Sequence, residues 1–242
     1  ILLRQGVELT DRYIAHLRNH FIEVIYVSTG SDVPPQDVIS DQTRVRALAE
    51  TKRLLGQVKR GTSLEVEQVH QALIGIIDEL LLQEEVMINL VDIRSFDEEL
   101  FHHSVNVAIL AVIVGIELDY SKRRLQNLAV GALLHDIGKL FSDDDVEHVT
   151  IGCNILRNNG NIDSKIITAI YQHHEHWDGK GYPDRLSGSE ICRDARILQV
   201  TNVFDHMSAN SRYPMEEVIE FLMALSGTRF EPATVRAFLN CV

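Results

Sequence analysis

The sequence lacks features typical of a membrane, secreted or redox-active protein. Its longest apolar run, Val107 to Ile116, has ten residues, which suits a buried core helix and predicts no membrane span. The three cysteines, Cys153, Cys192 and Cys241, form no CxxC pair and are odd in number. Reduced thiols are the simplest interpretation, and they favour a cytoplasmic protein. Because the chain begins at Ile1 rather than Met, we expect it to be part of a longer protein.

Basic residues are also scarce. The chain has 23 Lys and Arg against 35 Asp and Glu, which gives a formal net charge of −12. A protein that grips a nucleic-acid backbone usually presents a basic face, so we expect no nucleic-acid polymer as a partner. The one basic cluster, Lys122-Arg123-Arg124, follows a helix break. A solvated helix start is its simpler interpretation, and a small anionic ligand is the alternative.

Strand signals are scarce, so the predicted fold class is mainly α. Residues 1–40 combine a helical pattern with a short β-like run, which predicts a small N-terminal α/β module. Residues 41–95 have a helical pattern and predict linking helices that pack on a neighbour or on a second copy, as in a homodimer. From 96 to 242 the pattern is helical nearly throughout and predicts the functional domain. The apolar period of the linking segment includes Val66, Val69, Leu73, Ile76, Ile77 and Leu80.

Histidine placement is the most informative feature. Seven of the eleven histidines fall between positions 102 and 176. His135-Asp136 follows the apolar segment Leu128 to Leu134, where burial costs several kcal/mol unless each group is paired or binds a metal. A structural hydrogen bond is the simpler interpretation of one such pair. A carboxylate can bridge two cations, however, and imidazole suits Fe, Mn, Ni or Zn.

A second adjacent pair, His173-His174, follows a short predicted helix. Neighbouring helical residues point about 100° apart, so both can reach one metal only if the helix ends there. Glu99 and His103 are four residues apart and share a face if they lie on one helix. Taken together on helices of one domain, these residues predict a metal site. The remaining histidines are interpreted as ordinary, solvated or supporting residues: His16, His20, His70, His102, His176 and His206.

Two segments, His135 to Lys139 and His173 to Pro183, closely resemble the HD-GYP family of cyclic di-GMP phosphodiesterases. The resemblance spans roughly residues 96–242 and implies an HD-type helical bundle. It also implies a cyclic dinucleotide substrate and two or three divalent metal ions. Iron and manganese are the expected metals, because the ligands mix imidazole and carboxylate.

The resemblance also implies roles for individual residues. Asp136 would bridge two metals and Lys139 would stabilise charge on the scissile phosphate, which makes these two the expected catalytic residues. The loop Gly181-Tyr182-Pro183 would shape the edge of the site and bind a signalling partner. Arg212 is the remaining candidate for holding substrate phosphate. The expected metal ligands are Glu99, His103, His135, Asp136, His148, His173, His174 and Asn202.

The expected reaction follows from metal chemistry. Two cations about 3.5–4 Å apart activate a bridging water, and the resulting hydroxide attacks phosphorus in line. Two departures from the family favour an alternative, a weak or inactive domain that binds metal and nucleotide or a signalling partner. The family usually has an aspartate in place of Asn202, and it usually has basic residues near Ser211 and Pro214. The link between Lys139 and His148 is also shorter than usual, so either a loop over the site is deleted or that loop is missing from this sequence.

Overall fold

The computed structural model describes Thr10 and residues 38–62, 64, 66–83, 99–158, 162–209 and 213–242. All of these except Thr10 belong to one unit, Asp37–Val242. The predicted N-terminal α/β module and Arg212 lie outside the described residues, as does the side chain of Glu99.

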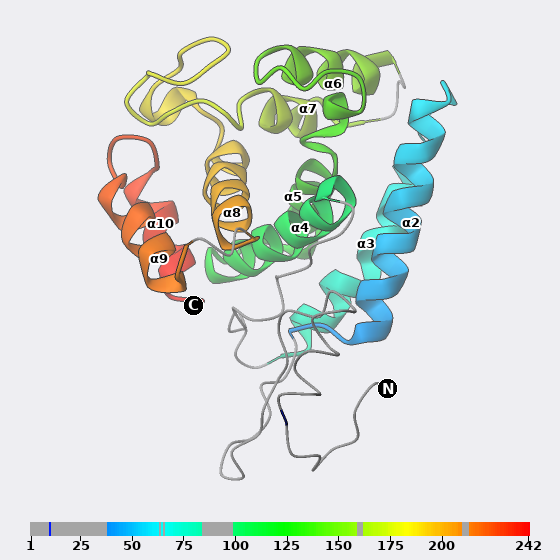
Figure 1. Ribbon diagram of the computed structural model, residues 1–242, viewed down its shortest axis with the longest axis horizontal. Coiled ribbons are helices and arrows are strands. Elements are labelled where there is room, and N and C mark those ends of the chain that lie inside the picture. The colour runs from blue at the N-terminus through cyan, green and yellow to red at the C-terminus, as the bar shows by residue number, and fades with distance from the viewer. Residues whose placement is uncertain are drawn as a thin grey trace. The chain divides into compact units, whose positions relative to one another are not determined.

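The described residues form helices and no strand, which confirms the mainly α prediction (Figure 1). Two isolated bridges, Asp178 with Ser187 and Ser226 with Phe230, tie loops together. The α-helices are α2 (Asp41–Lys59), α3 (Val66–Leu81), α4 (Glu99–Glu117), α5 (Lys122–Leu134), α6 (Glu147–Asn158), α7 (Ser164–Tyr171), α8 (Arg193–Ala209), α9 (Met215–Ala224) and α10 (Pro232–Leu239). Two short 3₁₀ helices are η1 (Ile137–Leu140) and η2 (Gly188–Glu190).

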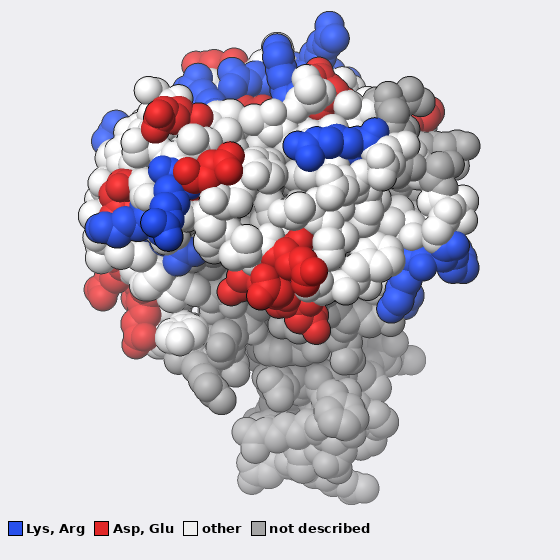
Figure 2. Space-filling view, turned by 90° about the horizontal axis from the view of Figure 1, so that it is seen from above, with Lys and Arg blue, Asp and Glu red and all other residues white. Residues whose placement is uncertain are grey.

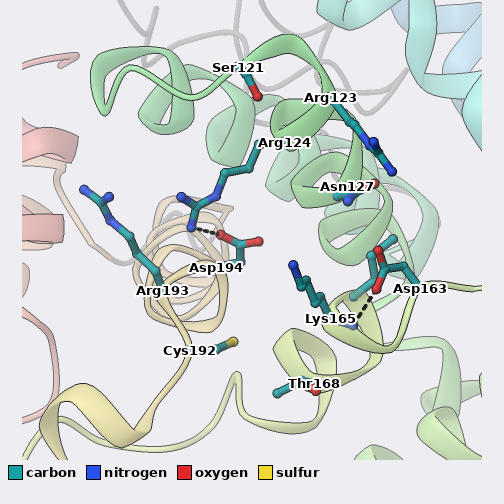
Figure 3. Close-up of a pocket in the computed structure, with 11 residues that line it drawn as sticks. Ser121, Arg123, Arg124, Asn127, Asp163, Lys165, Thr168, Cys192, Arg193 and Asp194 are labelled. Carbon is teal, nitrogen blue, oxygen red and sulfur yellow. Dashed lines mark hydrogen bonds and ion pairs between the residues drawn. The ribbon is translucent and has the colours of Figure 1, made fainter.

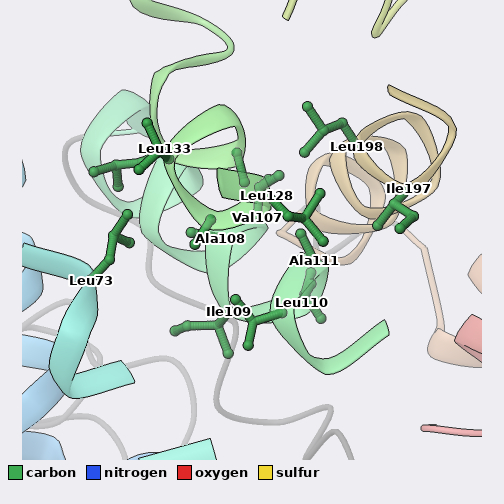
Figure 4. Packing of buried hydrophobic residues seen from close by; sticks show 14 of the residues in the cluster. Leu73, Val107, Ala108, Ile109, Leu110, Ala111, Leu128, Leu133, Ile197 and Leu198 are labelled. Carbon is green, nitrogen blue, oxygen red and sulfur yellow. The ribbon is translucent and has the colours of Figure 1, made fainter. Parts of the chain in front are cut away.

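Helix α4 is the central core helix. It contacts α5, α8, α2, α3 and α10, and Figure 4 shows its residues Val107 to Ala111 packed among side chains of α3, α5 and α8. The segment Leu100–Glu117 is long and apolar enough to cross a membrane, but 72% of it is buried inside the protein. Core packing therefore explains its apolar character, as predicted from the sequence for the run Val107 to Ile116.

Helices α2 and α3 also contribute to this core. Leu54 of α2 and Leu73 and Ile76 of α3 are almost completely buried, and α3 contacts both α4 and α5. Glu79 of α3 accepts hydrogen bonds from the backbone and side chain of Ser40, the residue that caps α2. The apolar faces of the predicted linking helices therefore pack against other helices of the same chain. The proposed division at residues 40 and 95 and the homodimer remain predictions.

A close approach between η1 and α6 positions the candidate site. A Cβ atom on Gly138 would lie 1.8 Å from the carbonyl oxygen of His148. On the α6 side, a Cβ on Gly152 would lie 3.3 Å from the backbone nitrogen of Gly138. Two glycines therefore let the turn that carries Asp136 reach the first turn of α6.

We predict that Gly138→Ala destabilises the fold by roughly 1–3 kcal/mol, because backbone must move to admit the methyl group. Chemical denaturation followed by circular dichroism measures the change. Gly56→Ala is the matched control, because its nearest neighbour is the flexible end of Arg60 at 3.4 Å; it should stabilise α2 by up to about 1 kcal/mol. A Gly138→Ala protein as stable as the parent would contradict the close approach.

Candidate metal centre

Five helices bring the candidate ligands together. In Figure 1, α6 and α7 lie over one end of the α4–α5–α8 core, and α7 contacts α5, α6 and α8. The residues that meet there come from α4 (His103), the end of α5 (His135 and Asp136), α6 (His148), the turn after α7 (His173 and His174) and α8 (Asp205, which contacts His103). Asn202, a further expected ligand, lies buried on α8.

Both adjacent pairs lie where a helix ends. Helix α5 stops at Leu134, and the backbone of Asp136 leaves the helical conformation to begin η1. Helix α7 stops at Tyr171, so the rings of His173 and His174 approach to 3.9 Å between centroids. Ending the helix lets neighbours in sequence point to one centre, which a continuous helix would prevent.

The carboxylate of Asp136 lies at the middle of the cluster and is fully buried. Its Oδ1 atom is 3.3 Å from Nε2 of His148 and 3.7 Å from Nε2 of His173. Its Oδ2 atom is 3.3 Å from Nε2 of His135 and 3.5 Å from Nε2 of His103. Each carboxylate oxygen therefore faces its own pair of imidazole nitrogens, an arrangement that can bridge two cations.

The other ring nitrogen of each histidine is held by an oxygen. Nδ1 of His135 is 2.7 Å from the carbonyl of Ala132, and Nδ1 of His173 is 2.6 Å from the carbonyl of Ile170. A protonated Nδ1 donates to these acceptors, which leaves the lone pair of Nε2 directed at the centre. The same relation holds for His148 with the carbonyl of Asp144 at 3.0 Å. Nδ1 of His103 lies 2.6 Å from the carboxylate of Asp205.

Several buried polar atoms have no hydrogen-bond partner among the described residues. Among them are Asp136 Oδ1, His148 Nε2, His173 Nε2, His174 Nε2 and Asn202 Oδ1. Leaving one such atom unsatisfied costs about 1–3 kcal/mol. Ligand atoms of Asp136, His148, His173 and His174 also lie within 4.8 Å of one another. The donor set therefore fits a divalent cation.

Burial keeps two of these imidazoles neutral, as a metal ligand must be. It lowers the pKa of His173 to about 3, and the nearby ring of His135 adds to the shift. Burial also lowers the pKa of His174, with a further contribution from His173. Both rings therefore offer an unprotonated nitrogen at neutral pH.

Charge is concentrated on the Oδ2 side of Asp136. Burial would raise the pKa of Asp136, but the surrounding histidines, led by His135, outweigh it and hold that pKa well below its usual range. Burial would also lower the pKa of His103, yet Asp136 and Asp205 raise it to about 9. Lys139 adds an ammonium 2.6 Å from Oδ2, and its side chain is 27% exposed. The protonated ring of His103 and the ammonium of Lys139 therefore both lie next to Oδ2 of Asp136.

Sequence reasoning missed two residues on α8. Asp205 positions His103, as described above. His206 was interpreted as an ordinary residue, but its ring stacks on that of His103 with 4.1 Å between centroids. Ligand atoms of His103, Asp136 and His206 lie within 4.8 Å of one another. The available signal was its spacing of four from Asn202, which places both on one face of a helix.

The Gly181-Tyr182-Pro183 loop folds against His174. A Cβ atom on Gly181 would lie 2.4 Å from the carbonyl oxygen of His174, so only glycine permits this approach. The Tyr182 ring stacks on the His174 ring at 4.7 Å between centroids. Buried Glu175 accepts hydrogen bonds from the backbone of Asp184 and Leu186, which fixes the loop. The loop therefore forms one wall of the centre.

The surface around this end carries both signs of charge. On the face shown in Figure 2, Lys and Arg occur in separate groups, and so do Asp and Glu, whose largest group lies near the lower middle. No broad basic surface forms on this face, in keeping with the net charge of −12.

Several known proteins are similar to the helical part of this chain. The HD domain family model matches residues 100–207. A cyclic di-GMP phosphodiesterase of Thermotoga maritima is 32% identical over 165 residues, which are 60% of this chain and 45% of that protein. The 3'3'-cGAMP-specific phosphodiesterase 2 of Vibrio cholerae is 34% identical over 128 residues, which are 44% of this chain and 24% of that protein. The chain thus spans less than half the length of either relative.

A solved structure shares the fold. Bd1817, an HDG"Y"P protein from Bdellovibrio bacteriovorus, superimposes with a TM-score of 0.70 at 19% identity and covers 96% of this chain and 80% of its own. This shared fold is consistent with the family match and with the buried His-Asp cluster. Residues 100–207 of this chain are therefore similar to HD domains, which bind divalent metal ions, and the buried His-Asp cluster lies within this range.

Proposed function

We propose that this chain is a metal-dependent phosphodiesterase that hydrolyses cyclic di-GMP. The observation that carries the proposal is the buried Asp136 carboxylate, whose two oxygens each face a pair of imidazole nitrogens. The similarity to cyclic dinucleotide phosphodiesterases of Thermotoga maritima and Vibrio cholerae supports the substrate class.

In this proposal the ligands divide into two sets around Asp136. His148, His173 and His174 would hold one divalent ion on the Oδ1 side. His103 and His135 would hold a second ion on the Oδ2 side, with Asn202 and His206 of α8 as further ligands. Glu99 is the candidate ligand for a third. Iron and manganese suit this mixture of imidazole and carboxylate.

The metal ions would supply an activated nucleophile at neutral pH and a Lewis acid for the phosphoryl group. The protein's own residues would bind the phosphate and control the access of water. Lys139 reaches the exposed edge of the centre, where its ammonium can leave Asp136 for a phosphate oxygen and stabilise the charge that develops there. Tyr182, stacked on His174, limits the access of water from that side.

His206 can add a neutral ligand to a site in which Asn202 lacks the charge of an aspartate. An amide oxygen can coordinate a metal but carries no charge, so an ion on the Oδ2 side is held more weakly than with an aspartate. The imidazole of His206, one helical turn further along α8, is close enough to His103 and Asp136 to add a ligand.

The alternative is a domain that binds metal and cyclic dinucleotide without hydrolysing it. The neutral Asn202 and the pairing of Lys139 with Asp136 at 2.6 Å favour this alternative. Purified, metal-loaded chain incubated with cyclic di-GMP and 3'3'-cGAMP separates the two, because binding without turnover of either substrate would reject hydrolysis. The products also show whether cleavage stops at the linear dinucleotide.

Two proposals about partners remain. The Gly181-Tyr182-Pro183 loop would bind a signalling protein, and the chain would form a homodimer in the cytoplasm. Light scattering of the purified chain tests the dimer directly.

We predict that Asp136→Ala loses bound metal and lowers hydrolysis more than about 100-fold, because the one carboxylate serves both ions. Elemental analysis and product chromatography measure the two effects. Asp145→Ala, at an exposed carboxylate, should change neither. If Asp136→Ala hydrolysed cyclic di-GMP as well as the parent, the mechanism would be wrong.

Lys139→Ala should separate binding from catalysis. Removing the ammonium frees Asp136 for metal, so the metal content should stay the same or rise. Hydrolysis should fall by about 10²–10³-fold, the usual loss when one stabilising donor is removed. Lys180→Ala is the control, because Lys180 pairs with Asp178 on the surface at 2.7 Å. Unchanged kcat in Lys139→Ala would remove Lys139 from the reaction.

A double-mutant cycle tests the roles of Asn202 and His206. Asn202→Asp should tighten metal binding because it adds a charge, and His206→Ala should weaken it. In the double variant the loss caused by His206→Ala should shrink, because the introduced carboxylate then takes over the ligand role. Metal titration by calorimetry gives all four affinities. Equal affinities for the parent and His206→Ala would show that His206 is not a ligand.

A further inference from the structure

A cavity of about 690 Å³ lies at the opposite ends of the helices that carry the metal ligands. It is formed where α5, α7 and α8 begin, whereas His135 and His173 follow the far ends of α5 and α7. The two ends of α5, which has 13 residues, are about 20 Å apart, and those of α7, which has 8 residues, are about 12 Å apart. The cavity is lined by Ser121, Arg123, Arg124, Asn127, Asp163, Lys165, Ile166, Thr168, Cys192, Arg193 and Asp194 (Figure 3).

Two carboxylates line this cavity, and both already have partners. Asp163 caps α7 by accepting the backbone N–H of Lys165 at 2.9 Å. Asp194 accepts hydrogen bonds from the hydroxyl of Tyr120 and from Arg124, both at 3.0 Å. Neither carboxylate therefore forms an ion pair with Arg123, Lys165 or Arg193.

Three of the four cations in the lining lack such a partner. Among the described residues, no carboxylate lies within 4.0 Å of the charged group of Arg123, Lys165 or Arg193. Figure 3 shows the Lys165 side chain reaching into the cavity toward Asp194 and Asn127. In a chain of net charge −12, this cavity therefore carries a local excess of positive charge.

The start of α5 adds to that excess. Its first turn is Lys122-Arg123-Arg124 and contains no acidic residue, and Ser121 makes no side-chain capping hydrogen bond. Positive side chains at the positive end of a helix dipole are unfavourable, and an anion there is favourable. Lys122 forms an ion pair with Asp78 at 2.7 Å and does not line the cavity, whereas Arg123 does. An anion between these groups would relieve the repulsion that the fold leaves in place.

The size and the lining define the chemical class of the ligand. Pockets for small molecules usually have volumes of about 300–1,000 Å³, which suits a nucleotide rather than an isolated inorganic ion. Arginine side chains match phosphate oxygens well because their donors form a planar fork. Ile166 and the thiol of Cys192 provide an apolar wall for the rest of such a molecule.

We propose that this cavity is a second binding site, separate from the metal centre, that takes a small phosphate-bearing ligand of nucleotide size. Arg123, Lys165 and Arg193 hold the phosphate, and the base or sugar lies against Ile166 and Cys192. The site is independent of the proposed hydrolysis, because none of its residues contacts the metal centre.

Calorimetric titration of the full chain with GMP tests this proposal. The titration is done on metal-loaded chain and again after chelation, since phosphate bound at the metal centre is lost on chelation. Saturable binding of GMP that survives chelation is expected, and guanosine, which lacks the phosphate, should bind at least about 10-fold more weakly. Binding should also weaken as salt is raised.

Charge reversal locates the ligand. Lys165→Glu and Arg123→Glu should each weaken GMP binding by about 10-fold to 100-fold. Arg157→Glu, which reverses an exposed cation on α6 outside the cavity, is the matched control and should bind like the parent. Circular dichroism confirms that each variant is folded. The proposal is overturned if chelated chain does not bind GMP, or if both cavity variants bind it as tightly as the parent.

Discussion

The structure depends on one buried carboxylate. Asp136 is fully buried, and histidines from α4, α5, α6 and the end of α7 surround it within 3.7 Å. An isolated carboxylate in such a place would be very costly, so its charge needs compensation. Imidazoles, a lysine and the implied cations provide that compensation. The helix ends, the glycine contact between η1 and α6 and the loop over His174 all serve to bring these groups to Asp136.

The two ends of α5 and α7 have opposite electrostatic character. At one end each helix stops early, and the residues that follow turn toward a centre of imidazoles around a carboxylate. At the other end the same helices begin beside the arginine and lysine side chains of the cavity. A rigid pair of helices therefore joins a site built for cations to a cavity suited to anions.

Much of this arrangement could be predicted from the sequence, and the reasons differ between residues. The mainly α fold follows from the apolar period and the scarcity of strand signals. Neither His135-Asp136 nor His173-His174 indicates a metal site alone, but their occurrence together on helices of one domain predicts one. The structure brings these residues together with His148 and His103.

Other features could not be predicted, because they depend on packing between distant segments. An apolar period shows that α3 has a buried face, but not that α4 and α5 cover it. His206 has no histidine beside it in sequence, and its place next to His103 becomes evident only when α8 packs on α4.

The wide spacing of the ligands along the chain has a thermodynamic consequence. His103 and Asp205 are 102 positions apart, and the groups that meet near them come from three further segments. An ion bound there acts as a crosslink that the unfolded chain cannot reproduce, because it closes long loops at once. Folding and metal uptake are then linked equilibria, and the melting temperature becomes a function of the free metal concentration around the protein.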